Sequence, residues 1–171
     1  MNLIPEIVDH HEELISWRHD LHRHPELGFE EFRTAKIVAE KLSSFGIEVH
    51  EGFATTGVVG VLRAGTSNRS IALRSDIDAL NLQEENTFDH RSVHDGKMHG
   101  CGHDGHATML LAAAQYLAVH KNFDGTVYFI FQPAEEAGNG GLKMINDNLF
   151  DLVRSDMIYG MHNFPGLEVG D

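Results

Sequence analysis

Residues 98–117, MHGCGHDGHATMLLAAAQYL, join a histidine- and glycine-rich segment to a helical pattern, and this junction decides the fold. The helical part is apolar on most sides, which is typical of a helix buried against a broad surface such as a sheet. Residues 98–106 hold three His, one Asp and the only Cys of the chain. Cys101 and His103 are two positions apart, so their side chains leave an extended backbone on the same side and could bind one metal ion. The junction therefore predicts a metal site at the start of a buried helix.

Two other interpretations of residues 98–106 stay open at this point. Cys101 could be a nucleophile with His103 as its base, or it could be a small buried hydrophobe in a loop without a site. A thiolate and an imidazole are ligands that borderline and soft divalent metals prefer. The density of such residues favours the metal site.

The composition limits the class of partner. The 171 residues include 26 acidic and 13 basic side chains, a formal charge of −13, and no Lys/Arg cluster, which argues against a nucleic-acid partner. A single Cys cannot form an internal disulfide, and the N-terminal segment lacks the apolar core of a signal peptide. No apolar run is long enough to span a membrane. We expect a cytoplasmic protein of one domain, without a membrane partner.

Helices and strands are expected in both halves of the chain. Apolar spacing predicts one helix from Asn2 to about His24 and a second from about Glu30 to Phe45. Histidines in the last turn of the first helix are expected to interact with the helix C-terminus. Short β-branched runs predict strands, of which the second and third below would form a hairpin and the fourth would be buried on both faces. These strands are residues 47–49, 58–63, 70–74, 125–131 and 157–161.

Helix and strand alternate from residue 103 onward, which predicts an α/β sheet with helices on its faces. In such sheets ligands bind beyond the carboxyl ends of the strands. Several segments carry metal-binding side chains just past a strand or before the buried helix. They are Asp76 with Asp78, Cys101 with His103, Glu135 with Glu136, and His162.

The adjacent pair Glu135 and Glu136 suggests a reaction. Neighbouring side chains on an extended segment point apart, so one carboxylate could bind metal while the other faces the substrate. A metal lowers the pKa of bound water, and a free carboxylate can take the proton of that water and pass it to a leaving nitrogen. Asp76 and Asp78 could fix a ligating His or could cap a turn.

Five ordered blocks of sequence resemble one family of enzymes, the amidohydrolase branch of the M20 metallopeptidases. This branch includes hippurate hydrolases, auxin-conjugate hydrolases and N-acetyl-diaminopimelate deacetylases, and the resemblance covers essentially the whole chain. The blocks are RHDLHRHPELGFEE (18–31), ALRSDIDALNLQE (72–84), MHGCGHDGHATMLL (98–111), FQPAEEAGNGG (131–141) and YGMHNFPG (159–166).

The resemblance implies a set of roles. Its metal ligands would be Cys101, His103, Glu136 and His162, holding two divalent ions, Mn²⁺ or Zn²⁺. Glu135 would be the general base, and Asp78 would orient a ligand. The implied substrate is a small N-acyl amino acid, hippurate-like or acetyl-amino-acid-like, and full-length relatives are expected to form homo-oligomers. The implied fold is a zinc-peptidase-like α/β sheet flanked by helices, with an inserted domain that dimerises and closes over substrate.

The sequence departs from the family pattern in two places. Asn81 stands where relatives commonly have Pro, which affects a turn. The chain also stops at Asp171, before the inserted domain, the last His ligand and the closing part of the catalytic domain. We therefore expect residues 1–171 to be the N-terminal portion of the catalytic domain, with an open sheet edge. The alternatives are an inactive metal-binding fragment or a fragment that needs a complementary chain.

Overall fold

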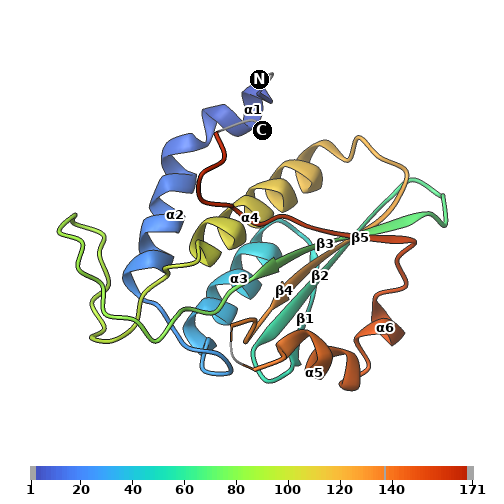
Figure 1. Cartoon of the computed structure of the whole chain (residues 1–171). Coiled ribbons are helices and arrows are strands. Elements are labelled where there is room, and N and C mark those ends of the chain that lie inside the picture. The colour runs from blue at the N-terminus through green and yellow to red at the C-terminus, as the bar shows by residue number, and fades with distance from the viewer. Residues whose placement is uncertain (1–2, 137, 169–171) are drawn as a thin grey trace.

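The computed structural model describes residues 3–136 and 138–168, which form a mixed α/β structure (Figure 1). Asn2, where the first helix was expected to begin, and Ala137 of the glycine-rich segment lie outside the described residues. The helices are α1 (Pro5–Asp9), α2 (His11–Arg23), α3 (Phe32–Ser44), α4 (His103–His120), α5 (Gly140–Asn146) and α6 (Leu149–Leu152). The strands are β1 (Glu48–Phe53), β2 (Gly57–Ala64), β3 (Ser70–Asp76), β4 (Gly125–Gln132) and β5 (Met157–Gly160).

One sheet of five strands, in the order β1-β2-β4-β3-β5, organises the chain. β1 pairs with β2 and β2 with β4 in antiparallel fashion, whereas β3 runs parallel to both β4 and β5. The predicted hairpin of residues 58–63 and 70–74 is wrong, because β4 lies between these two strands. The aromatic and β-branched side chains of β4 are apolar on both faces, so burial favours this strand at the centre of the sheet.

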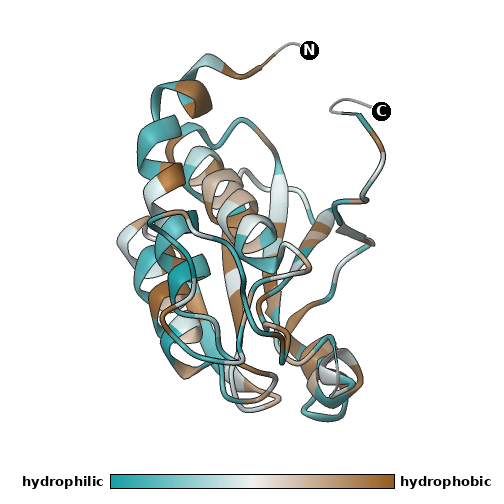
Figure 2. Cartoon of the chain, turned by 60° about the vertical axis from the view of Figure 1, so that its left-hand side comes forward, coloured by the Kyte–Doolittle hydropathy of each residue, from teal (hydrophilic) through white to brown (hydrophobic). Residues whose placement is uncertain are grey.

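Helices cover both faces of the sheet (Figure 1). On one face α3 and α4 pack on the strands, with α2 beside α4, around a core that includes Leu42, Leu111 and Phe129. On the other face α5 and α6 enclose a second core around Tyr128 and Met144. Figure 2 shows that the strands carry much of the hydrophobic colour. The predicted fold class, an α/β sheet flanked by helices, is confirmed.

The first helical segment differs in detail from its prediction. The structure breaks it at His10, the residue between α1 and α2, and the helix ends at Arg23. The second helix begins at Phe32, whose ring is 61% exposed although it was expected on the apolar face. Thr34 and Ala35 of the same turn are buried instead, so Phe32 lies outside the buried face of α3.

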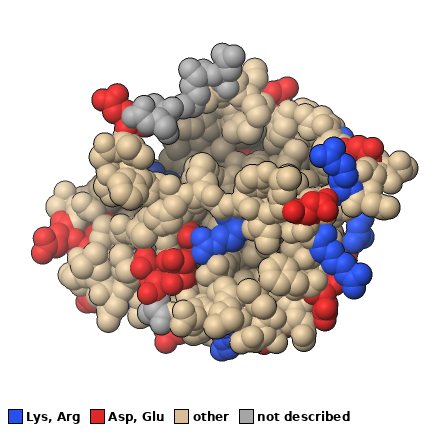
Figure 3. All heavy atoms as spheres, turned by 45° about the vertical axis from the view of Figure 1, so that its right-hand side comes forward, with Lys and Arg blue, Asp and Glu red and all other residues tan. Residues whose placement is uncertain are grey.

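The sheet ends in an open edge at β5. Its side chains are exposed, including Met157, Ile158 and Tyr159, and within the described residues β5 pairs with β3 alone. In Figure 3 charged side chains on the right-hand face of Figure 1 are separated by wide uncharged areas. The sheet edge expected to be open is thus exposed at β5 in the part of the chain that the structure describes. None of the helices described is long and apolar enough to cross a membrane.

Leu111 tests the buried face of α4. We expect Leu111→Ala to lower the free energy of unfolding by about 3 kcal/mol, because the side chain is fully buried and the substitution leaves a cavity. Urea denaturation measures this. Val119→Ala, on the same helix but 74% exposed, should change stability by less than about 0.5 kcal/mol. Equal effects of the two substitutions would contradict the placement of α4.

Candidate metal centre

The carboxyl ends of β3, β4 and β5 lie at the same end of the sheet, because these three strands are parallel to one another. We call this end of the sheet the rim. Asp76 is the last residue of β3, Glu135 follows β4, and His162 follows β5. Helix α4 begins at His103 above the same rim. Gly102 makes this start possible: its φ is +93°, and a Cβ there would collide with the side chain of Asn163.

Asp78 holds two parts of the rim together. His103 Nδ1 lies 2.9 Å from the carbonyl oxygen of Asp78 and 3.2 Å from its Oδ1, and it donates to them. The other oxygen, Oδ2, accepts the backbone N–H of Glu136 at 3.0 Å. Donation from Nδ1 fixes the tautomer of His103 and leaves the lone pair of Nε2 free for a ligand. Asp78 therefore orients both His103 and the Glu135–Glu136 segment.

His103 Nε2 is buried and has no hydrogen-bond partner. It faces three carboxylates, with Asp76 Oδ2 at 3.7 Å, Glu136 Oε1 at 3.8 Å and Glu135 Oε2 at 4.0 Å. Burial lowers the pKa of His103, but the hydrogen bond to Asp78 and the carboxylates outweigh it, so the pKa is raised. The same carboxylates that favour a proton on Nε2 would favour a divalent cation in its place, so the donor set fits a metal.

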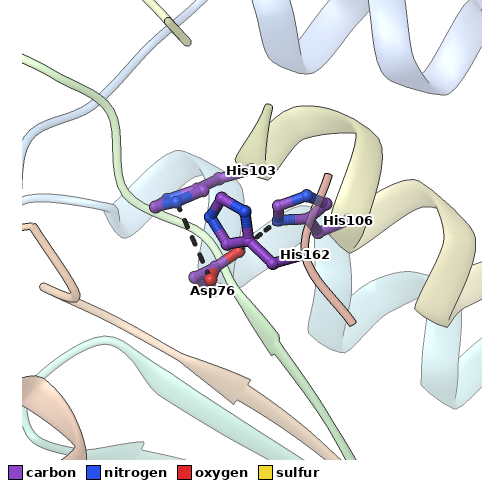
Figure 4. A group of neighbouring side chains, drawn as sticks. All are labelled: Asp76, His103, His106 and His162. Carbon is purple, nitrogen blue, oxygen red and sulfur yellow. Dashed lines mark hydrogen bonds and ion pairs between the residues drawn. The ribbon is translucent and has the colours of Figure 1, made fainter. Parts of the chain in front are cut away.

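Possible ligand atoms form two overlapping groups that share His103, and within each group they lie within 4.8 Å of one another. The thiol group consists of Cys101, His103 and Glu136. The imidazole group, drawn in Figure 4, consists of Asp76, His103, His106 and His162. Cys101 Sγ lies 3.4 Å from His162 Nε2 and so links the two groups. All four ligands predicted from the sequence thus meet at one place.

The surroundings of Cys101 bear on the nucleophile interpretation. Burial, together with Glu136, raises the pKa of its thiol to about 12. A nucleophilic cysteine needs a lowered pKa, usually from a neighbouring cation. The contact of the thiol is with His162, and His103 is bonded to Asp78 instead. The geometry therefore disfavours a Cys101–His103 nucleophile pair.

The sequence did not single out His106. Its Nδ1 lies 2.7 Å from Asp76 Oδ1, and its Nε2 lies 2.6 Å from Asn163 Oδ1 and 3.2 Å from the backbone nitrogen of Asn163. Figure 4 shows the rings of His103 and His106 on either side of His162. The sequence feature that could have identified His106 is its three-residue spacing from His103, which places both side chains on one face of α4.

A buried carboxyl group supports the segment before Glu135. Glu31 is fully buried, and it accepts the Thr56 hydroxyl at 2.6 Å and the Ala134 N–H at 2.8 Å. Ala134 has a φ of +48°, a strained value for a residue with a side chain. Burial raises the pKa of Glu31. This anchor holds the backbone bend that turns Glu135 toward the rim.

A second cluster lies behind the start of α4. His22 is buried, and its ring nitrogens lie 2.9 Å from Asp104 Oδ2 and 3.0 Å from Glu84 Oε1. Arg18 Nε donates to Asp104 Oδ2 at 3.3 Å. Burial opposes ionisation of Asp104, but the hydrogen bond to His22 and the neighbouring positive charges together outweigh it and lower the pKa of Asp104 to about 2. His22 thus has partners on other segments, a more specific environment than the helix C-terminus expected for it.

The fold and the rim together define a metal-binding α/β protein. Residues 72–171 match Peptidase family M20/M25/M40, and the chain belongs to this family. It is 53% identical over 165 residues to a hippurate hydrolase of Campylobacter jejuni, a match that covers 96% of this chain and 43% of that protein. It is 42% identical to the IAA-amino acid hydrolase ILR1-like 4 of Arabidopsis thaliana, covering 92% of this chain and 35% of the plant protein.

A solved structure supports the same family assignment. The YXEP protein of Bacillus subtilis, described as a dinuclear metal-binding peptidase of the M20 family, superposes with a TM-score of 0.88 at 40% identity. The match covers 95% of this chain and 46% of that one. The chain therefore spans less than half the length of these relatives.

His22 is expected to contribute to the free energy of unfolding in a pH-dependent way, because its pKa is raised. The hydrogen bond to Asp104 raises its pKa, against burial, with a further contribution from Glu84. Arg18, His90 and His99 also face the cluster, and burial lowers the pKa of His99 to about 4, so this ring is neutral. A raised pKa means that the contribution is complete below about pH 6.5 and is lost as the pH rises through the folded-state value.

We therefore expect His22→Gln to lower the free energy of unfolding more at pH 6 than at pH 9. Urea denaturation of both proteins at the two pH values measures the difference. His11→Gln, an exposed position on the same helix, is the matched control and should show no such dependence. An equal loss for His22→Gln at both pH values would contradict a charged His22.

Proposed function

We propose that this chain carries the N-terminal part of a metal-dependent amidohydrolase that cleaves the amide bond of an N-acyl amino acid. One observation carries the proposal: His103 Nε2 is buried without a partner and faces the carboxylates of Glu135 and Glu136. The support from comparison is the identity to hippurate hydrolase and to a Geobacillus stearothermophilus N-acyl-L-amino acid amidohydrolase.

The proposed ligands are Cys101, His103, Glu136 and His162, which would hold two divalent ions, Mn²⁺ or Zn²⁺. Two overlapping groups that share His103 support a pair of ions, as does the dinuclear description of the Bacillus subtilis structure. Bound divalent ions would polarise the amide carbonyl and lower the pKa of a water molecule. Thiolate and imidazole favour Zn²⁺, whereas carboxylates also admit Mn²⁺.

Glu135 is the proposed general base. Its side chain is 40% exposed, in contrast to the fully buried His103 that it faces, so substrate and water can reach it. Both carboxylates face His103, Glu136 at 3.8 Å and Glu135 at 4.0 Å, so the two side chains do not point apart as expected from the sequence. In this proposal Glu136 binds metal, and the more exposed Glu135 takes a proton from the attacking water and delivers it to the leaving nitrogen. Asp78 keeps both glutamates in register through the N–H of Glu136.

The domain assignment is also a proposal. Residues 1–171 would form the N-terminal portion of the catalytic domain, and the inserted domain and the closing segment would lie in the part of the relatives that this chain does not match. Homo-oligomerisation and a cytoplasmic location stay predictions from the sequence.

A second candidate is an inactive metal-binding fragment, or a fragment that needs a complementary chain. The exposed edge strand β5 favours it, because His162 follows directly on this strand and is itself exposed. Acyl and amino-acid pockets would then be completed by other residues.

Glu135→Gln tests the base. In an active form that includes the portion matched by the rest of the relatives, we expect turnover of N-acyl amino acids to fall by about 10²- to 10⁴-fold with bound metal unchanged. Amino-acid release and metal content by elemental analysis are the measurements. Glu85→Gln, in the exposed loop, should leave both unchanged. Full activity of Glu135→Gln with metal bound would rule out the assigned base.

The 171-residue chain itself separates the two candidates. Under the first proposal we expect slow release of the amino acid from hippurate when Mn²⁺ or Zn²⁺ is added, and loss of release on chelation. Under the second, the chain binds metal but releases nothing, and adding the complementary part restores release. Activity that persists through chelation would contradict both.

A further inference from the structure

His22 lies between two carboxylates that belong to other parts of the chain. It is 7% exposed, with Nδ1 directed at Asp104 and Nε2 at Glu84. Ionised carboxylates only accept hydrogen bonds, so the ring satisfies both by donating from both nitrogens. A ring with two donors at opposite ends can bridge two segments, whereas an amide side chain donates from one end only.

The bridge joins three segments. His22 comes from the last turn of α2, Asp104 from the first turn of α4, and Glu84 from the long loop of residues 81–97. Glu84 in turn accepts the backbone N–H of Ser92 and the side-chain amide of Asn86. The cluster therefore fixes this loop and the start of α4 to α2.

The start of α4 has no side-chain N-cap. Its first residue is preceded by Gly102, which has no side chain to cap the helix. The first turn is held instead by side chains that point outward, with His103 bonded to Asp78, Asp104 to His22, and His106 to Asp76. Asp104 directly follows His103, so a shift of one moves the other.

We infer that His22 is a positioning residue for the metal centre, because its bridge between Glu84 and Asp104 fixes the helix turn that carries His103. The inference rests on the proposed function, since it assumes a metal ion at the rim. His22 touches none of the proposed ligands, and it acts through Asp104. Partners that orient ligands from outside the coordination sphere change metal affinity by about 10- to 100-fold in known sites.

Titration of the 171-residue chain with Co²⁺ tests this inference. Co²⁺ replaces Zn²⁺ in such sites and gives visible absorption bands that report ligand geometry, including a band from the Cys101 thiolate. We expect His22→Gln to weaken Co²⁺ binding at least about tenfold and to shift these bands. Glu84→Gln, which removes charge from the other end of the bridge, should act in the same direction. The double variant should lose less than the product of the two single losses, because both act through one network.

Leu42→Ala is the matched control. Leu42 is a fully buried residue of α3 that belongs to neither the His22 cluster nor the candidate ligand groups, so its loss lowers the melting temperature and should leave the Co²⁺ affinity and bands unchanged. Unchanged Co²⁺ binding in folded His22→Gln and Glu84→Gln would overturn the inference alone. Equal weakening in Leu42→Ala would reduce His22 to a general stability role and overturn it too. Absence of Co²⁺ binding by the unsubstituted chain would overturn the proposed centre itself.

Discussion

The carboxylate of Asp78 is the constraint on which the rim depends. With one oxygen it fixes the ring of His103, and with the other it holds the N–H of Glu136. Two segments 33 residues apart in sequence are thereby set by a single buried group, which is 1% exposed. Burial alone would raise the pKa of Asp78, yet these hydrogen bonds dominate and keep it lowered. The carboxylate therefore stays charged where an acceptor of two donors is needed.

The charges around the rim are unbalanced within the protein. Asp76, Glu135 and Glu136 face His103. The buried Asp76 is paired with Arg74 at 2.8 Å and with His106 at 2.7 Å, whereas the exposed Glu135 and Glu136 have no Lys or Arg partner among the described residues. A cation beside His103 would complement these two carboxylates. The cluster around His22 contrasts with it, because there the ring and Arg18 compensate Asp104 internally. His22 is thus paired at both ring nitrogens, whereas the buried Nε2 of His103 has no hydrogen-bond partner in the protein.

The sequence predicted the rim better than it predicted the sheet. Strand ends mark where side chains leave a parallel sheet, so the carboxylates after β3 and β4 and His162 after β5 could be assigned to one edge from local patterns. Strand order could not. Residues 125–131 were expected to be buried on both faces, but no local pattern showed that this strand lies between β2 and β3, where a hairpin was expected. His22 was missed for a similar reason. Its partners Glu84 and Asp104 lie 62 and 82 residues away, and no local pattern reports contacts at that distance.

His103 and Asp78 are held in the interior of the protein, whereas His162 follows an exposed edge strand. His103, the first residue of α4, and Asp78, which follows β3, are both buried, and β3 has a neighbouring strand on each side. His162 follows β5, which in the described chain has one neighbouring strand and exposed side chains throughout. A ligand is held only as firmly as the backbone that carries it, because ordering that backbone costs conformational entropy when metal binds. If His162 is a ligand, as proposed, a segment that packed on β5 would reduce this cost and strengthen metal binding through His162 without contacting an ion itself.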